Sequence, residues 1–184
     1  MKKDRGFTMI ELLLVIAILG VLAVVVLIAL NPLQQIARAR DSGRISGVTQ
    51  LGHAIEAYGT TNSGIYPPVT NWMTTLRDAG EIASLPSNIP YTVISVGCST
   101  NAQNGYCYSL NPVVGSVEWT VYSRLESNTH TSRCTAVGGG NPYAVYSNLA
   151  GRGGVSCCAS EPTTANFSEI PGANPGANCA GFLP

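Results

Sequence analysis

The strongest constraint in this sequence is a long apolar run close to its N-terminus. Between residues 7 and 30 the chain reads FTMIELLLVIAILGVLAVVVLIAL, which only Thr8, Glu11 and Gly20 interrupt. As an α-helix this run would rise about 36 Å, more than the roughly 30 Å thickness of the hydrocarbon core of a bilayer. We therefore expect residues 7–30 to form a membrane-spanning helix.

A cleaved secretory signal peptide is the alternative interpretation of this run. The apolar part of such a peptide is about 7 to 15 residues long and ends at a small-residue cleavage site. The observed run is longer, it ends in Ala29-Leu30-Asn31, and a carboxylate stands near its start. These features favour a helix that stays in the membrane.

Composition limits what the remainder of the chain can be. A chain of 184 residues has room for this helix and one modest soluble domain. Charged residues make up 11% and the formal net charge is zero, so neither nucleic acid nor an anionic membrane surface is predicted as the main partner. A surface with so few charges favours an assembled or extracellular protein over a free cytosolic one.

All the cysteines lie in the distal half of the chain, at positions Cys98, Cys107, Cys134, Cys157, Cys158 and Cys179. Because no Cys-x-x-Cys pair occurs, we expect disulfides in an oxidising compartment rather than a zinc site. Basic residues flank both ends of the apolar run, so the charge rule does not orient it. The cysteines do, because they place the distal half outside the cytoplasm and the N-terminus inside.

A second helical pattern follows the apolar run, over residues 31–58. Apolar residues recur there at three- and four-residue steps, which predicts an amphipathic continuation of the helix. Pro32 removes a backbone donor and should kink or unwind the helix locally. Gly43, Gly47 and Gly52 lower its intrinsic stability, so this half of the helix needs packing partners.

The distal part is predicted to be a β domain over residues 59–160. A short helix capped by Asn71 and stopped by Gly80 comes first, and short strands are then expected at residues 91–96, 106–110, 118–125 and 143–147. They suit an antiparallel meander with one face covered by the stripe of residues 45–58. Residues 161–184 should form an irregular tail. The predicted fold class is α+β: a long kinked N-terminal helix on a small antiparallel sheet, with a disulfide-tied C-terminal region.

The start of the chain carries the most specific motif. Residues 2–11, KKDRGFTMIE, resemble the leader junction of type IV pilins and type II secretion pseudopilins. The features in common are a short basic leader, Gly before Phe, and a carboxylate four residues past that Phe at the start of a long apolar helix. The similarity covers about the first third of the chain, to the turn at residues 64–67.

The resemblance implies a processing route and a set of partners. Prepilin peptidase would cut between Gly6 and Phe7 on the cytoplasmic face, remove the leader of residues 1–6, and leave a Phe7 amine that is usually methylated. An inner-membrane platform with a cytoplasmic assembly ATPase, and other copies or related pilins, are the further partners implied. The chain would first be a single-pass inner-membrane protein and then part of an extracellular or periplasmic fibre.

Glu11 stands out on physical grounds as well. An acidic side chain inside a membrane segment costs up to about 2.5 to 3.5 kcal/mol at the helix centre. Its place one turn from the helix start lowers that cost through the interface and the helix dipole. In the related fibres this carboxylate would face the Phe7 amine of a neighbouring subunit. Similar pilins also lose helicity between the positions of Gly20 and Pro32 on assembly.

The resemblance further favours a set of disulfide pairs. Adjacent Cys157 and Cys158 are not expected to bond to each other. Cys98 with Cys107 is the favoured short pair, and Cys134 and Cys179 would each take one of the vicinal cysteines. This arrangement would hold the tail.

The charged cluster after the membrane segment is assigned no site. Arg38, Arg40 and Arg44 with Asp41 could contact Glu56 or Glu81 of another subunit. More often such a cluster is a solvated helix face, and exposed pairs contribute only about 0 to 1 kcal/mol.

No catalytic motif is recognisable. The two histidines, His53 and His130, lie in no nucleophile motif and are expected on the surface. No cofactor is expected; calcium held by backbone carbonyls stays open but has no support, since no Asp follows Asp78.

The predicted function is a structural subunit of a type IV pilus or type II secretion pseudopilus, and not an enzyme. A minor tip pilin with an adhesive or DNA-capturing distal domain and a membrane-anchored extracellular enzyme are the alternatives. The pattern does not separate twitching, attachment, DNA uptake and secretion.

Overall fold

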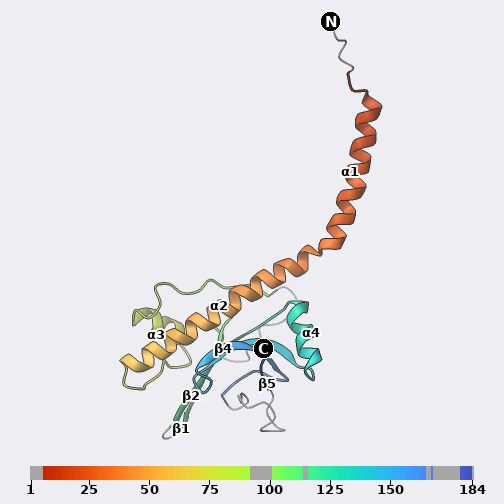
Figure 1. The fold of residues 1–184 in the computed structure, drawn as a ribbon. Coiled ribbons are helices and arrows are strands. Elements are labelled where there is room, and N and C mark those ends of the chain that lie inside the picture. The colour runs from red at the N-terminus through yellow and green to blue at the C-terminus, as the bar shows by residue number, and fades with distance from the viewer. Residues whose placement is uncertain (1–5, 92–100, 114–115, 165–166, 168–178, 184) are drawn as a thin grey trace. The chain divides into compact units, whose positions relative to one another are not determined.

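The computed structural model describes residues 6–91, 101–113, 116–164, 167 and 179–183. It divides into two units, Met1–Ile36 and Ala37–Pro184. The elements are α1 Met9–Leu30, α2 Pro32–Thr61, α3 Trp72–Asp78, β1 Cys107–Val113, β2 Ser116–Arg124, α4 Asn128–Ala136, β3 Asn141–Ser147, β4 Arg152–Cys158 and β5 Cys179–Phe182 (Figure 1).

The break in the long N-terminal helix falls at a single residue. Asn31 has a φ of 42°, in the left-handed region, and closes α1. Pro32 follows as the first residue of α2, where its missing N–H leaves no helical bond unmade. Gly20 lies inside the continuous α1, and its predicted part in a loss of helicity on assembly stays a prediction. The interruption needs both Asn31, which tolerates positive φ, and Pro32.

The strands form one antiparallel sheet in the order β1-β2-β3-β4-β5, each paired with the next along the chain. This is the predicted meander, and β1, β2 and β3 overlap three of the predicted strands. The remaining predicted strand, at residues 91–96, lies mostly outside the described residues. Two strands were not predicted: β4, which is short of large apolar side chains, and β5, which lies in the segment expected to be irregular.

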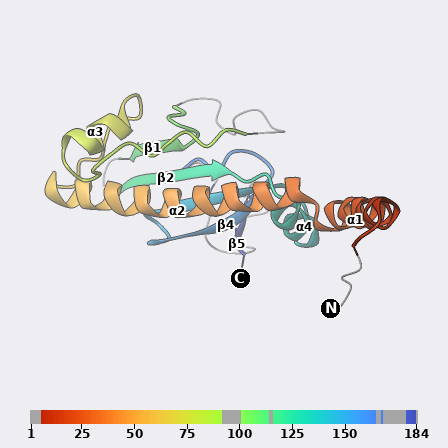
Figure 2. The same ribbon diagram turned by 90° about the horizontal axis from the view of Figure 1, so that it is seen from above.

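The helix α2 lies along one face of this sheet (Figure 2), where the main core forms. The core joins residues of α2, α3 and the sheet, namely Val48, Leu51, Ala54, Ile55, Trp72, Met73, Leu76, Tyr106, Tyr108, Trp119, Val121, Leu125, Ala144 and Tyr146. Both tryptophans of the chain are fully buried here. This is the packing that the apolar stripe of residues 45–58 predicted.

The opposite face of the sheet is covered too, which the sequence pattern did not predict. A second core gathers there around Cys107, Tyr122, Tyr143, Val145, Cys158, Phe167 and Cys179. The segment after β4 crosses this face: the Thr120 hydroxyl donates to the Pro162 carbonyl at 3.0 Å, and the Tyr122 hydroxyl donates to Glu161 at 3.1 Å. The expectation that one face of the sheet would stay uncovered was therefore wrong. Polar side chains of β2 hold the segment that follows β4 across this second face.

Glycines of α2 let aromatic rings approach the helix backbone. A Cβ built on Gly52 would overlap the Tyr146 ring, and one on Gly59 would stand 2.6 Å from a Tyr66 ring carbon. Interiors packed at crystal density have no room for such an atom. Gly52 and Gly59 thus weaken α2 as an isolated helix but are positions at which it docks.

Replacing Gly52 with alanine should therefore destabilise the distal domain, although alanine is the better helix former by about 1 kcal/mol. The new methyl group would meet the Tyr146 ring close to its own Cβ, where the ring cannot swing away. Overpacking of this kind costs about 1–3 kcal/mol. Denaturant unfolding of the detergent-solubilised full chain, followed by tryptophan fluorescence, measures the change.

Gly43 offers the matched control for this substitution. It lies on the same helix and is exposed, and its added Cβ would meet only the end of the Ile89 side chain, at 3.3 Å. Gly43→Ala should leave the unfolding midpoint unchanged or raise it. Equal effects of the two substitutions would show that close packing at Gly52 is not what holds α2.

Two short helices complete the domain. Asn71 occupies the N-cap position of α3, but its side chain makes no capping bond. Its carbonyl accepts the Thr75 N–H at 3.0 Å and the hydroxyls of Thr74 and Thr75. Gly80 follows the helix with a φ of 81°, as a helix stop requires. The helix α4 was not predicted, since its sequence NTHTSRCTA contains mostly weak helix formers.

The disulfides hold the ends of the domain to β4. Cys134 of α4 bonds to Cys157, and Cys158 bonds to Cys179 of β5. Neighbouring strand residues point to opposite faces, so the vicinal cysteines reach partners on different sides of the sheet. This agrees with the expectation that Cys134 and Cys179 would each bond to one of the vicinal cysteines. Cys107 is also disulfide-bonded, and its predicted partner Cys98 lies outside the described residues.

Candidate functional site

The start of α1 is a closed hydrogen-bonded turn. Thr8 is the N-cap, and its hydroxyl accepts the Glu11 N–H at 3.3 Å. The Glu11 carboxylate in return accepts the Thr8 backbone N–H at 2.9 Å and the Thr8 hydroxyl at 2.7 Å. This reciprocal arrangement is a capping box, which satisfies backbone donors that a helix start leaves open.

The capping box gives Glu11 a place within an apolar helix. It is the one ionisable residue in α1, Met9–Leu30. Two hydrogen bonds from Thr8 and the positive end of the helix dipole both favour a carboxylate at this position. The capping role of Thr8 was not predicted, although Thr-x-x-Glu before an apolar run is a recognisable signal.

The remainder of α1 is an uninterrupted apolar surface. None of its residues is buried in the described structure, and Phe7 just ahead of it is 79% exposed. Within the described residues, one helical stretch, Met9–Thr61, contains a segment long and apolar enough to cross a membrane. Such a surface requires lipid or other protein as its surroundings.

The residues just ahead of α1 are accessible. Gly6 is exposed and has no neighbouring atoms where a side chain would stand, so the peptide bond to Phe7 is open. Residues 1–27 match the family model of the prokaryotic N-terminal methylation motif. The chain carries a prepilin-type methylation motif. No curated protein and no solved structure matches the chain.

The methylation motif includes the leader and most of α1, with Gly6, Phe7, Thr8 and Glu11 inside its bounds. It is the N-terminal segment of type IV pilins and pseudopilins, and it fits the membrane anchoring expected of α1. The motif ends before α2 and the sheet, so the distal domain lies beyond the match.

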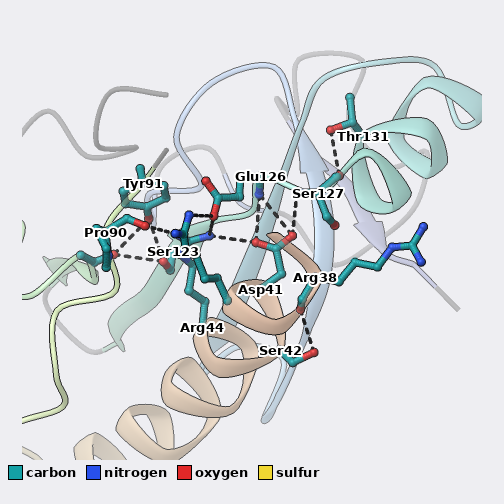
Figure 3. Close-up of polar contacts among 12 residues, drawn as sticks. Arg38, Asp41, Ser42, Arg44, Pro90, Tyr91, Ser123, Glu126, Ser127 and Thr131 are labelled. Atoms are coloured by element: carbon teal, nitrogen blue, oxygen red, sulfur yellow. Dashed lines mark hydrogen bonds and ion pairs between the residues drawn. The ribbon is translucent and has the colours of Figure 1, made fainter. Parts of the chain in front are cut away.

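A second polar centre lies where α2 meets the sheet, and it corrects the expectation of a solvated helix face (Figure 3). Asp41 and Arg44 are 0% and 1% exposed. The Nη1 atom of Arg44 lies 2.9 Å from Asp41 Oδ1 and 3.3 Å from Glu126 Oε1. Asp41 also accepts the backbone N–H groups of Glu126 at 3.0 Å and Ser127 at 2.8 Å.

The same arginine fixes the segment ahead of residue 91. Arg44 Nη2 donates to the Pro90 carbonyl at 3.1 Å, and the guanidinium lies 4.1 Å from the centre of the Tyr91 ring. The Tyr91 hydroxyl in turn lies 2.9 Å from Ser123 Oγ. The cluster of Asp41, Arg44 and Glu126 thus joins α2 to β2, to the start of α4 and to the Pro90 segment.

The sequence did contain a signal for this burial. Asp41 and Arg44 continue the three- and four-residue spacing of Val48, Leu51 and Ile55, so they share the buried face of α2. Charged residues on that face require partners, and Glu126 and two backbone N–H groups provide them. Arg40 reaches Glu126 from the edge at 3.4 Å, whereas Arg38 is exposed and points away (Figure 3).

The histidines differ from each other. His53 is exposed, as expected, and lies beside Tyr146, whose hydroxyl donates to Glu56 at 3.0 Å. Burial and this bond to Glu56 raise the pKa of Tyr146 to about 12. His130 is half-buried on α4 rather than in a surface loop, and burial lowers its pKa. The described residues contain no cluster of His, Cys, Asp or Glu suited to a metal ion.

Proposed function

We propose that this chain is a structural subunit of a type IV pilus or type II secretion pseudopilus. The observation that carries the proposal is the methylation motif at residues 1–27. It is supported by the exposed apolar surface of α1 and by the single carboxylate held at the start of that helix. The role is structural and not enzymatic: the chain assembles through its N-terminal helix.

The proposed route begins in the membrane with the N-terminus in the cytoplasm. Prepilin peptidase cuts between Gly6 and Phe7, and the new amine of Phe7 is methylated. An inner-membrane platform and its ATPase then transfer α1 from lipid into the core of a fibre. The disulfides of the distal domain support its placement on the oxidising side.

Cleavage changes the chemistry of the helix start. In the precursor the Phe7 nitrogen is an amide, and among the described residues Glu11 is bonded to Thr8. After cleavage the nitrogen is a cation, and the Phe7 amine of a neighbouring copy can pair with the Glu11 carboxylate. In an apolar core such a pair fixes the register between helices, because either charge left alone there is costly.

The proposal can be tested by zero-length cross-linking, because the chain is short of amines. Its only lysines are Lys2 and Lys3, in the leader. The mature chain therefore has a single aliphatic amine, on Phe7. A lipid-soluble carbodiimide, which can enter the apolar core, should join Phe7 of one copy to Glu11 of another in sheared fibres. The product would be seen as a ladder on denaturing gels and as that cross-linked peptide by mass spectrometry.

A chain that keeps its leader provides the control. Gly6→Leu places a side chain at the scissile bond and should leave the precursor uncut, without fibres or a Phe7 cross-link. Absence of the wild-type chain from sheared fibres would contradict the proposed function. Fibres that contain the chain but lack this cross-link would contradict the proposed pairing.

A further inference from the structure

A groove opens on one flank of α2, within the distal unit. Its volume is about 400 Å³, and it lies between the helix and the segment that follows α3. The residues that line it and matter to its chemistry are Gly47, Gln50, Leu51, Glu81, Ile82 and Ser84. At Gly47 the Tyr106 ring packs against the helix backbone and closes this end of the groove from behind.

The groove combines one carboxylate with an apolar floor. Glu81 accepts a hydrogen bond from the Thr61 hydroxyl at 3.3 Å, and none of the ion pairs of the described residues includes it. Leu51 and Ile82 supply apolar surface beside it. A long cationic side chain fits this chemistry, since its methylene stem can cover apolar atoms while its charge meets the carboxylate.

Arg38 is the side chain of this kind that lacks a partner among the described residues. It is exposed on α2 and points away from the buried Asp41 cluster (Figure 3). The other arginines of the distal unit are engaged by neighbours, namely Arg40, Arg44, Arg77, Arg124, Arg133 and Arg152. The mature chain has no lysine that could serve instead.

Arg38 and the groove cannot meet within one copy. Gly47, at the near end of the groove, is nine residues from Arg38, which is about 14 Å along a helix and two and a half turns around it. Thr61, which binds Glu81, is 23 residues or about 35 Å away. The two sites therefore lie on opposite sides of α2. Two parallel copies side by side, shifted along the helix axis, would bring Arg38 of one copy to the groove of the next.

We propose that Arg38 of one copy occupies this groove on the neighbouring copy and pairs there with Glu81. The inference rests on the proposed function, because it requires parallel copies in a fibre. A contact whose two halves lie on different sides of the subunit is heterologous, and repetition of such a contact builds an open helical filament. The pair would add a lateral contact outside the apolar core of the α1 helices.

Charge exchange tests the pairing. Arg38→Glu and Glu81→Arg should each lower the yield of sheared fibres about tenfold, since like charges would then face each other across the contact. The double variant should restore the yield. All three should keep leader cleavage. Arg77→Glu is the matched control, because Arg77 pairs with its own neighbour Asp78, and its yield should equal that of the wild type.

A cysteine pair gives an independent readout. Arg38→Cys combined with Glu81→Cys should give a ladder of disulfide-linked copies in sheared fibres, and Arg38→Cys combined with Glu118→Cys should not. Wild-type fibres together with full yields for both single charge variants, or with no ladder, would overturn the pairing and leave the proposed function standing. Failure of the wild type to form fibres would instead overturn the proposed function.

Discussion

Replacing Glu11 with alanine should abolish fibres while leaving leader cleavage intact. The carboxylate lies three residues beyond the Thr8 cap and is the only ionisable group in α1. Its removal takes away the one group in the helix that can neutralise a neighbour's Phe7 amine in an apolar core. An unpaired buried charge costs several kcal/mol, which every subunit added to the fibre would have to bear.

Two further substitutions separate charge from shape in this experiment. Glu11→Gln keeps the hydrogen-bonding geometry toward Thr8 but not the charge, and it should lose fibres like the alanine variant. Leu12→Ala changes the neighbouring exposed apolar position and should retain fibres. Immunoblots of sheared fractions and N-terminal sequencing of the cell-bound chain measure both steps. Normal fibres from Glu11→Ala would exclude the proposed pairing with Phe7.

Replacing Asp41 with alanine should strongly destabilise the distal domain. Its carboxylate holds Arg44 and the backbone N–H groups of Glu126 and Ser127; Arg44 and Ser127 are buried and Glu126 is partly buried. Removal of one partner of a buried ion pair costs about 3–5 kcal/mol, because the remaining charge and donors stay out of water without compensation. The free energy of unfolding should fall by that amount.

The measurement uses the protein's own fluorescence. Trp72 and Trp119 are both fully buried in the main core, so their emission reports unfolding of the detergent-solubilised full chain. Asp78→Ala is the control, since the Asp78 side chain is 67% exposed in its pair with Arg77 and should contribute less than about 1 kcal/mol. Equal losses for Asp41→Ala and Asp78→Ala would show that the buried cluster does not stabilise the domain.

Patterns of apolar residues predicted the parts of the fold that repeat regularly. The run at residues 7–30 and the stripe from Val48 to Ile55 gave α1 and the packed face of α2. The alternation around Trp119 and Val121 gave β2, although not the cover on its second face. These elements are predictable because burial of one face sets a period that the sequence must follow.

The elements that were missed depend on contacts that no local pattern shows. The helix α4 contains weak helix formers, and its disulfide to Cys157 and the Asp41 contact at its first turn hold it in place. Strand β5 exists through its pairing with β4 and the bond from Cys158 to Cys179. Of the candidate site, Gly6, Phe7 and Glu11 could be named from the resemblance to prepilin leaders, and Glu11 also from its charge within an apolar run. The burial of Arg44 instead depends on Glu126, which is far away in sequence.

The single left-handed residue between α1 and α2 has a mechanical consequence. At Asn31–Pro32 the hydrogen-bond ladder of α1 ends and that of α2 begins, and the Gln35 side chain donates to the Leu30 carbonyl at 3.1 Å. Tension applied along a fibre would open this point before an intact turn. Each residue that passes from helical to extended backbone lengthens the chain by about 2 Å. Asn31 would thus act as an elastic element repeated once in every subunit.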